Sequence, residues 1–343
     1  MRRIYSIVTA ILVCVTGACA QEAVKKGLDA IRKQGIEAHL SFLADDILEG
    51  REAGKRGGAL AAGYIKTVLS GWGIAPFGDN YFQPFEAYSR DRQKKGNFRV
   101  HPDSIARYRQ EPGHRRLALK NVIGYIEGRN KNQYVILGAH YDHLGTDEAL
   151  EGDRVYNGAD DNASGVAAAL QVARACVATG EQPERSIVFA FWDAEELGCL
   201  GSEYFVANIE PTGTIKGYIN LDMLGRDGTL PFPAKKDTQE IIPNAFFFLY
   251  ADELAKYQEQ LAGDIDNYRL DITASTRVLS PRARGSDNAS FSVRNIPVLW
   301  FFSGIHPDYH TPGDEIDKIN FDKLTDLTKI VYLNLWKLAN EQY

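Results

Sequence analysis

Cysteine is scarce in this chain of 343 residues: it has four, and two of them fall within the first twenty positions. A disulfide framework therefore does not hold the fold together. The 39 lysines and arginines form no long basic run and are outnumbered by 45 acidic residues, for a formal net charge of −6, which argues against a nucleic-acid partner. Internal repeats are also lacking, and 44% of the residues are hydrophobic. These features predict a packed globular protein.

No stretch of the chain reaches the ~18 consecutive apolar residues of a confident membrane span. Residues 1–20 instead resemble an export signal, with two arginines, an apolar run and the small residues Ala18-Cys19-Ala20. Cleavage there would start the mature chain at Gln21. Residues 16–19 also fit a bacterial lipoprotein box, which would place a lipid anchor on Cys19. Both alternatives predict an exported, soluble mature protein that is periplasmic, secreted or an outer-membrane lipoprotein. Cys176 and Cys199 would remain, and two free thiols are expected over a bridge.

The lack of a linker predicts one catalytic domain over residues 21–343. Apolar residues at helical spacing predict helices over 28–42 and 58–69, and the charged stretch 89–116 is expected to be a surface hairpin or loop. Apolar, β-branched runs predict strands at 122–126, 134–137, 187–192, 218–221 and 297–302. A further helix is expected behind Asn162. This alternation predicts an α/β fold: a largely parallel mixed central sheet with helices on both faces, in a three-layer sandwich.

Possible metal ligands follow the carboxyl ends of the predicted strands, where open α/β sheets bind their ligands. They are His140 and Asp142, Asp160 and Asp161 in the next loop, Glu195 and Glu196, Asp222, and His306 and His310. One such residue alone is usually a satisfied polar side chain or part of a turn. Their recurrence at four successive strand ends favours a shared site. Imidazole and carboxylate without thiolate suit zinc or another divalent first-row metal in a hydrolytic site.

Five ordered segments of the sequence resemble the signatures of the co-catalytic dizinc exopeptidases. They are Gly138-Ala-His-Tyr-Asp-His143, Asn157-Gly-Ala-Asp-Asp-Asn-Ala-Ser-Gly165, Phe191-Trp-Asp-Ala-Glu-Glu-Leu-Gly198, Asn220-Leu-Asp-Met223 and Tyr309-His-Thr-Pro312. The resemblance extends from about His39 to the end and includes Leu48-Glu-Gly-Arg51. That family includes secreted bacterial leucine aminopeptidases, glutamate carboxypeptidases and glutaminyl cyclases.

The resemblance implies two zinc ions and assigns a role to each matching position. Asp161 would bridge the two ions, His140 and Asp222 would complete the ligands of one, and Glu196 and His310 those of the other. Glu195 would be the general base. Asp142 would orient His140 through its far ring nitrogen, and Tyr309 would donate a hydrogen bond to the developing oxyanion. His143 and His306 are left as non-ligands, and His39, His101 and His114 are expected to be structural or exposed.

The implied function is an exported dizinc metallo-aminopeptidase that hydrolyses N-terminal residues from peptides, with a metal-bound water and Glu195 as its base. The alternatives are a glutaminyl cyclase-like enzyme, a carboxypeptidase- or dipeptidase-like relative, and a catalytically inactive binding protein. One position departs from the family pattern, because Asn288 stands where a histidine is usual. The stretch from Gly228 to Ser280, including Pro231-Phe-Pro233 and the aromatic run 244–250, is expected either to wall the substrate pocket or to belong to the core.

Overall fold

A mixed sheet of nine strands runs through the molecule. The computed structural model describes residues 21–90, 97–100, 102–209, 214–227, 229–230 and 240–341. The sheet order is β1-β3-β7-β4-β8-β13-β11-β12, and β2 pairs with β3. The strands are β1 Ala75–Pro76, β2 Phe82–Ser89, β3 Arg115–Ile126, β4 Asn130–His140, β7 Arg185–Trp192, β8 Thr214–Asp222, β11 Ala245–Tyr250, β12 Thr273–Val278 and β13 Val298–Phe302. The four central strands β7, β4, β8 and β13 are parallel, whereas β3 and β11 join them antiparallel.

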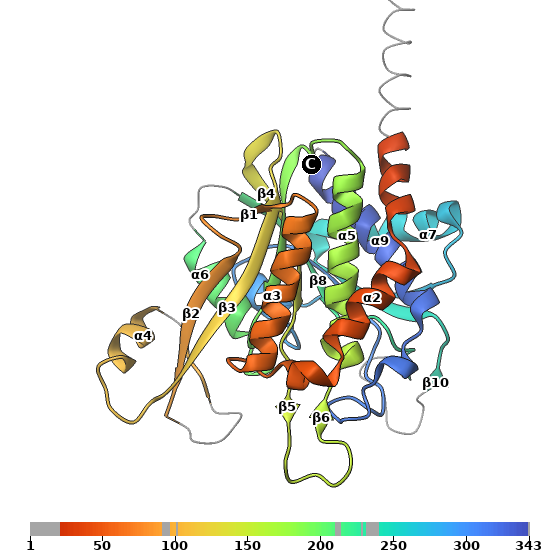
Figure 1. Ribbon diagram of the computed structural model, residues 1–343. Helices are drawn as coiled ribbons and strands as arrows, with labels where there is room; N and C mark the ends of the chain where they lie inside the picture. Colours follow the sequence, from red (N-terminus) through yellow and green to blue (C-terminus); the bar gives the residue numbers. More distant parts are fainter. Residues whose placement is uncertain are drawn as a thin grey trace, which may run out of the picture.

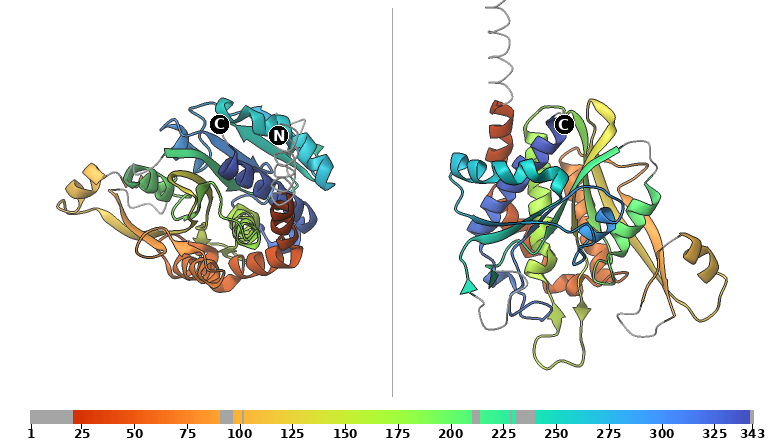
Figure 2. Two further views of the ribbon diagram at one scale, coloured as in Figure 1. Left: turned by 90° about the horizontal axis from the view of Figure 1, so that it is seen from above. Right: turned by 180° about the vertical axis from the view of Figure 1, so that it is seen from behind.

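Helices cover both faces of this sheet (Figures 1 and 2). One face carries α2 Lys33–Leu43, α3 Arg56–Gly71, α5 Gly165–Ala178, α7 Ala255–Tyr268 and α9 Phe321–Asn340. The other carries α6 Leu200–Asn208 and α8 Asn288–Ser292. Short hairpins of β5 Gly145–Thr146 with β6 Val155–Tyr156, and of β9 Thr229–Leu230 with β10 Glu240–Ile241, stand apart from the sheet. The expected three layers are thus present.

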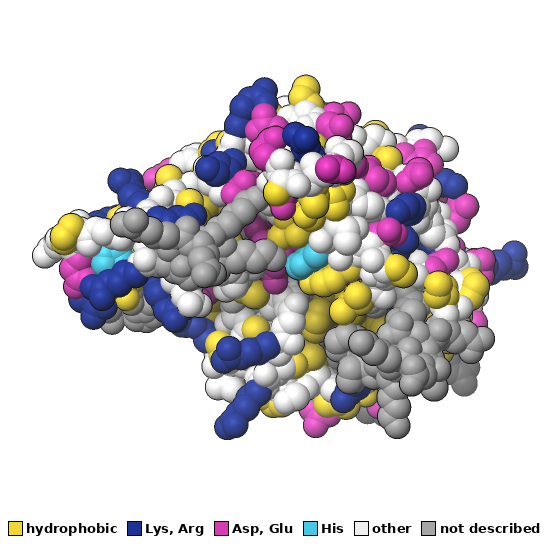
Figure 3. Space-filling model, turned by 90° about the horizontal axis from the view of Figure 1, so that it is seen from below, with side chains coloured by type: hydrophobic (Ala, Val, Ile, Leu, Met, Phe, Trp, Pro, Cys, Tyr) yellow, Lys and Arg dark blue, Asp and Glu magenta, His cyan; other side chains and the backbone are white. Residues whose placement is uncertain are grey.

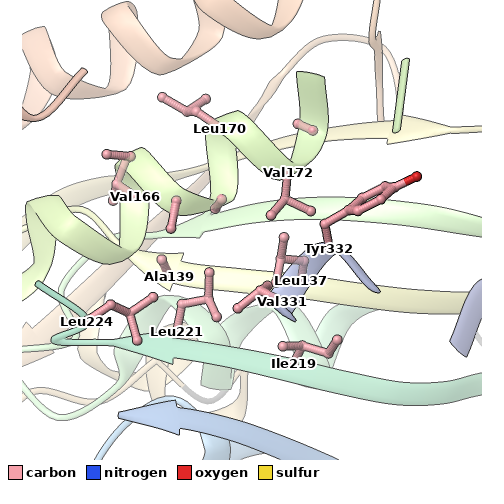
Figure 4. Packing of buried hydrophobic residues seen from close by; sticks show 14 of the residues in the cluster. Leu137, Ala139, Val166, Leu170, Val172, Ile219, Leu221, Leu224, Val331 and Tyr332 are labelled. Carbon is pink, nitrogen blue, oxygen red and sulfur yellow. The ribbon is translucent and has the colours of Figure 1, made fainter. Parts of the chain in front are cut away.

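The central strands are buried on both faces, which explains their continuous apolar runs. All eight residues of β7 are buried. Because side chains alternate along a strand, Ile187, Phe189 and Phe191 join the core under α5 and α9, whereas Val188, Ala190 and Trp192 join the core under α6 and α8. Figure 4 shows α5 and α9 side chains packed over β4 and β8. Removing these residues from water supplies the main stabilisation of the sheet.

The five predicted strands are confirmed. Four lie inside observed strands, and the fifth, 297–302, begins one residue before β13. One expectation needs correction: the helix predicted over 28–42 is broken at 31–32, so that residues 21–30 and α2 are separate helices. The stretch 89–116 connects the antiparallel pair β2 and β3, as a hairpin does, and it also contains a helix, α4 Pro102–Tyr108. Of the two alternatives for the aromatic run 244–250, the core is confirmed, because the run forms the buried strand β11 between β13 and β12.

Several other expectations concern single residues. Cys176 and Cys199 are both free thiols, so the expected absence of a bridge is confirmed. Asn288 is buried and donates a hydrogen bond to the carbonyl of Ala283. No helix in the described part of the chain is long and apolar enough to cross a membrane. Residues 1–20 with the export signal, His101, residue 228 and residues 231–239 lie outside the described residues.

His39 is a structural histidine, and it makes stability sensitive to acid. It is buried, with Nδ1 2.8 Å from the Tyr64 hydroxyl and Nε2 3.1 Å from the Gln171 amide. Burial lowers its pKa to about 4, and Arg174 adds to the effect. In the unfolded chain His39 has an ordinary pKa near 6.5. Between pH 6.5 and 4 the unfolded chain therefore binds more protons at His39 than the folded protein does, and stability falls as the pH falls through this window.

We expect this histidine to account for about 3 kcal/mol of stability lost between pH 7 and pH 4. The variant His39→Gln keeps polar partners but does not titrate. Between pH 7 and pH 4 its free energy of unfolding should therefore fall by about 3 kcal/mol less than that of the wild type. Urea unfolding of both proteins at a series of pH values measures the difference. Parallel pH dependences of the two proteins would show that His39 is not responsible.

Candidate metal centre

The side chains proposed from the sequence as ligands meet at the carboxyl end of the parallel strands. His140 is the last residue of β4 and pairs with Trp192 of β7, and Asp222 is the last residue of β8 and pairs with Phe302 of β13. The register thus brings these strand ends to one level. The β5–β6 hairpin extends beyond the same edge (Figure 1). Seen from below, a histidine lies at the middle of this face, beside hydrophobic and acidic side chains (Figure 3).

A first group of three possible ligands is formed by His140, Asp161 and Asp222. Nε2 of His140 lies 3.4 Å from Oδ1 of Asp161 and 3.5 Å from Oδ1 of Asp222. All three residues are buried. On its other side, Nδ1 of His140 is 3.3 Å from the backbone oxygen of Asp142, which leaves Nε2 facing the two carboxylates.

A second group lies against the other oxygen of Asp161. Nε2 of His310 is 3.1 Å from Oδ2 of Asp161 and 3.3 Å from Oε2 of Glu196. Asp161 thus turns one carboxylate oxygen to each group, as a bridging ligand must. Burial would raise the pKa of Asp161, but the facing His140, His143 and His310 lower it well below its usual value. The carboxylate is therefore held in the anionic form.

The spacing of these atoms fits zinc. Two ligands about 2.0–2.1 Å from one tetrahedral ion are roughly 3.3 Å apart. The distances from Nε2 of His140 to Asp161 and Asp222, and from Nε2 of His310 to Asp161 and Glu196, range from 3.1 to 3.5 Å and so match this value. The two oxygens of a single carboxylate can serve two ions. Hence the residues present fit two divalent ions that share Asp161.

The loop that carries Asp161 is shaped by hydrogen bonds that the sequence did not reveal. Oδ2 of Asp314 accepts hydrogen bonds from the backbone N–H groups of Asp160, at 3.1 Å, and Asp161, at 3.0 Å. Gly158 precedes the loop with a φ of +54°, and a Cβ there would lie 2.1 Å from the Asp161 carbonyl oxygen. Only glycine fits this position. Asp160 turns away from the candidate ligands and accepts from the N–H of Gly225.

Arg51 ties this loop to the rest of the site. Its buried guanidinium donates to the carbonyl oxygens of Tyr141, Leu43, Asn157 and Gly158. Burial lowers the pKa of Arg51 to about 10, opposed by nearby carboxylates. The resemblance included Arg51 in a matching segment, but only the structure shows what it does.

Replacing Arg51 by methionine is expected to lower the free energy of unfolding by about 3–5 kcal/mol, because four buried carbonyls would each lose a charged donor and, among the described residues, only that of Gly158 keeps another, the N–H of Ala163. The exposed Arg56 pairs with Glu49 at the surface. Its replacement by methionine is a matched control that should cost less than about 1 kcal/mol. Urea unfolding of both variants provides the comparison. Equal losses would mean that the Arg51 network contributes no more than a surface ion pair.

The two consecutive glutamates point to different neighbours. The carboxylate of Glu196 faces His143 and His310, whereas Oε1 of Glu195 lies 3.4 Å from the Sγ of Cys199. Burial raises the pKa of Glu195 well above its usual value; His140 opposes this shift, and Asp287 adds to it. A raised pKa suits a group that must accept and then release a proton near neutral pH.

Asp142 acts on this glutamate turn rather than on His140. Its Oδ1 lies 3.8 Å from Nδ1 of His140, which is too long for a hydrogen bond. The carboxylate instead accepts from the backbone N–H groups of Glu195, at 2.9 Å, and Glu196, at 3.3 Å. The carboxylate expected to orient His140 thus lies at ion-pair distance from Nδ1, and the backbone oxygen of Asp142 lies nearer, at 3.3 Å.

The other side chains of the motifs surround the two groups. The ring of Tyr309 stacks on that of His310, with centroids 3.8 Å apart. His306 is buried beside Asp160, at 3.4 Å, and is not part of either ligand group. His143, expected to be a non-ligand, lies in the centre itself. Its Nδ1 contacts Glu196, and His143, Asp161 and Glu196 lie close enough together to form a possible ligand group of their own.

A cavity of about 530 Å³ opens on the side of Glu196 and His310. Ala53, Leu117, Leu144, Tyr156 and Leu197 supply apolar walls, and Glu52, Lys55, Arg115 and Asp147 supply charges of both signs. A volume of this size is typical of small-molecule and peptide sites. Asn220, Ser286 and Asp287 near Asp222 are buried, and Asn220 donates a hydrogen bond to Ser286.

The chain is similar to known peptidases. Residues 121–334 match peptidase family M28, and the chain belongs to that family. The resemblance seen in the five sequence segments is thereby confirmed. The chain is 31% identical over 241 residues to leupeptin-inactivating enzyme 1 of Streptomyces exfoliatus, a match covering 64% of this chain and 48% of that protein.

A second protein sequence and a crystal structure are also similar to this chain. A probable zinc metalloprotease of Pyrenophora tritici-repentis is 26% identical over 259 residues, which cover 65% of this chain and 52% of that protein. The crystal structure of the LapA aminopeptidase of Legionella pneumophila superposes with a TM-score of 0.66 at 21% identity, covering 94% of this chain and 76% of LapA. The chain spans about half the length of the two curated relatives named here.

Proposed function

We propose that this chain is an exported, zinc-dependent aminopeptidase that removes N-terminal residues from peptides. The observation that carries the proposal is the position of Asp161, whose two oxygens face His140 on one side and His310 on the other. Asp222 and Glu196 complete the two sets. Two bound zinc ions would lower the pKa of a water and polarise the peptide carbonyl.

The chain's own residues supply the remaining chemistry. Glu195 would take a proton from the attacking water and deliver it to the leaving amine, which its raised pKa favours. Tyr309 would donate a hydrogen bond to the carbonyl oxygen as it gains charge. Asp142 holds the backbone of Glu195 and Glu196, so that the proposed base and the neighbouring ligand keep a defined relative position.

The shape of the site supports an exopeptidase. The cavity is lined by Glu196 and His310 of one ligand set, whereas His140 and Asp222 of the other set are buried and do not line it. We infer that the remainder of the peptide leaves through this cavity. The short N-terminal residue would then occupy the space at the ligands. Charges of both signs in the cavity wall give no preference for acidic or basic peptides.

A substrate panel tests this function. The mature, zinc-loaded protein should hydrolyse aminoacyl anilides and unblocked peptides, and N-acetylation of the same substrates should lower kcat/KM by more than 100-fold. Chelation should abolish the activity and zinc should restore it. Release of pyroglutamyl product from N-terminal glutaminyl peptides, without hydrolysis of the others, would instead identify a cyclase. Inactivity towards every substrate with both ions bound would indicate a binding protein.

Export is a separate part of the proposal and rests on residues 1–20. We expect the mature protein to begin at Gln21 or at a lipidated Cys19. Mass spectrometry of the N-terminal peptide from the native host distinguishes the two, because lipidation adds the mass of the acyl chains to Cys19. Intact Met1 as the main form in cytoplasmic material would contradict export.

A further inference from the structure

His143 is the residue of the centre for which the ligand assignment has no role. Its side chain is fully buried, and Nδ1 lies 2.7 Å from Oε1 of Glu196. The other oxygen of that carboxylate, Oε2, lies 3.3 Å from Nε2 of His310. The Glu196 carboxylate is thus divided, with one oxygen towards His143 and the other towards the proposed ion.

The distances distinguish a hydrogen bond from a shared ion. Ligands of one tetrahedral zinc are roughly 3.3 Å apart, and the pairs made by His310 agree with that value. The 2.7 Å separation between His143 and Glu196 is shorter and is typical of a charge-assisted hydrogen bond. The distance from Nδ1 of His143 to Oδ2 of Asp161 is 3.8 Å, longer than the ligand spacing.

The surroundings of His143 hold its ring in this orientation. Its backbone N–H donates to the carbonyl oxygen of Arg51 at 3.2 Å. The ring packs against Gly158, where a Cβ would come within 2.5 Å of Cδ2. Nε2 is buried and has no hydrogen-bond partner, so Nδ1 is the nitrogen available to a partner. A free rotation of the ring away from Glu196 is therefore blocked.

We propose that His143 is a positioning residue: it donates from Nδ1 to Oε1 of Glu196 and so aims Oε2 at the ion that Glu196 shares with His310. This inference rests on the proposed two-zinc function. Without that hydrogen bond the Glu196 carboxylate can rotate about its last bond, so its ion should bind more weakly. Partners of this kind typically change metal affinity by 10–100-fold. The ion held by His140 and Asp222 should be unaffected.

The test compares variants that differ in where they place a donor. An asparagine amide nitrogen lies near the position of Nδ1, whereas a glutamine amide lies near that of Nε2. We expect His143→Ala and His143→Gln to lower the affinity for one zinc ion 10–100-fold and to leave the affinity for the other unchanged. His143→Asn should bind both ions nearly as tightly as the wild type does. Zinc affinities are measured by chelator competition, with circular dichroism to check folding. His39→Asn, a buried histidine outside the centre, should bind both ions normally.

Cobalt substitution distinguishes a positioning residue from a ligand. If His143 only positions Glu196, the visible absorption of the cobalt-loaded His143→Asn protein should match that of wild type. A changed spectrum, or equal zinc loss in the asparagine and glutamine variants, would overturn the inference, as would unchanged affinity in His143→Ala. A wild type with a single zinc would contradict the two-zinc function. In that case, weaker binding of the single ion by His143→Ala would support the inference, and unchanged binding would overturn it.

Discussion

Replacing Asp161 by alanine is expected to remove both zinc ions, because each oxygen of its carboxylate faces a different ligand set. Turnover should fall by about 10³-fold or more, since metal ions contribute several kcal/mol of transition-state stabilisation. Metal content after dialysis against a zinc buffer gives the direct measurement. Asp222→Ala is the matched control, because it removes a carboxylate that belongs to the His140 ligand set alone.

The control should therefore keep one ion while Asp161→Ala keeps none. Wild-type protein that binds a single ion tightly, even when carefully loaded, would contradict the two-metal arrangement. That result would favour the glutaminyl cyclase-like alternative, which is expected to bind a single zinc. An Asp161→Ala protein that keeps one ion as tightly as wild type would show that Asp161 does not bridge.

Substitutions of the two neighbouring glutamates, Glu195 and Glu196, are expected to impair turnover for different reasons. Glu195→Gln removes a proton acceptor but preserves the shape of the side chain, so both ions should remain and the affinity for a substrate analogue should be nearly normal. Turnover should drop by the ~10²–10⁴-fold that general acid–base catalysis supplies. Steady-state kinetics and metal analysis of the same preparation test both parts.

Glu196→Gln exchanges an anionic ligand for a weaker neutral one. Its metal occupancy should fall, and its activity should recover in part as free zinc is raised. Glu195→Gln should show no such recovery. If Glu195→Gln retained both ions and worked within about threefold of wild type, Glu195 would have only a structural role in its turn, and the base would have to be another residue.

The sequence predicted the elements that depend on local patterns. The apolar runs of β4, β7 and β8 are long because both sides of these strands are buried, and that burial is visible in composition alone. The helix after Asn162 follows from its apolar spacing, although it begins three residues later, at Gly165. Patterns of this kind failed at residues 31–32, where a break separates two amphipathic helices without glycine or proline.

Ligand types at the strand ends were also predictable, because their positions relative to the strands are local. Which of Asp160 and Asp161 faces the centre was inferred from resemblance. In the structure the choice depends on distant partners. The Asp314 carboxylate accepts from the backbone N–H groups of both aspartates, and the Asp160 carboxylate accepts from the N–H of Gly225. Arg51 donates to the surrounding carbonyls. No periodicity in the sequence encodes those contacts.

The sequence by itself determined the class of fold, the strands that carry the site and the chemical types of its ligands, since hydrophobic periodicity and short motifs act over a few residues. Only the tertiary structure decided the division of the Asp161 oxygens between two ligand sets, the contact of the Asp142 carboxylate with the glutamate turn, and the hydrogen bond from His143 to Glu196. These contacts join residues more than fifty positions apart in most cases. Their geometry depends on sheet register and on buried partners such as Arg51, which a linear pattern does not contain.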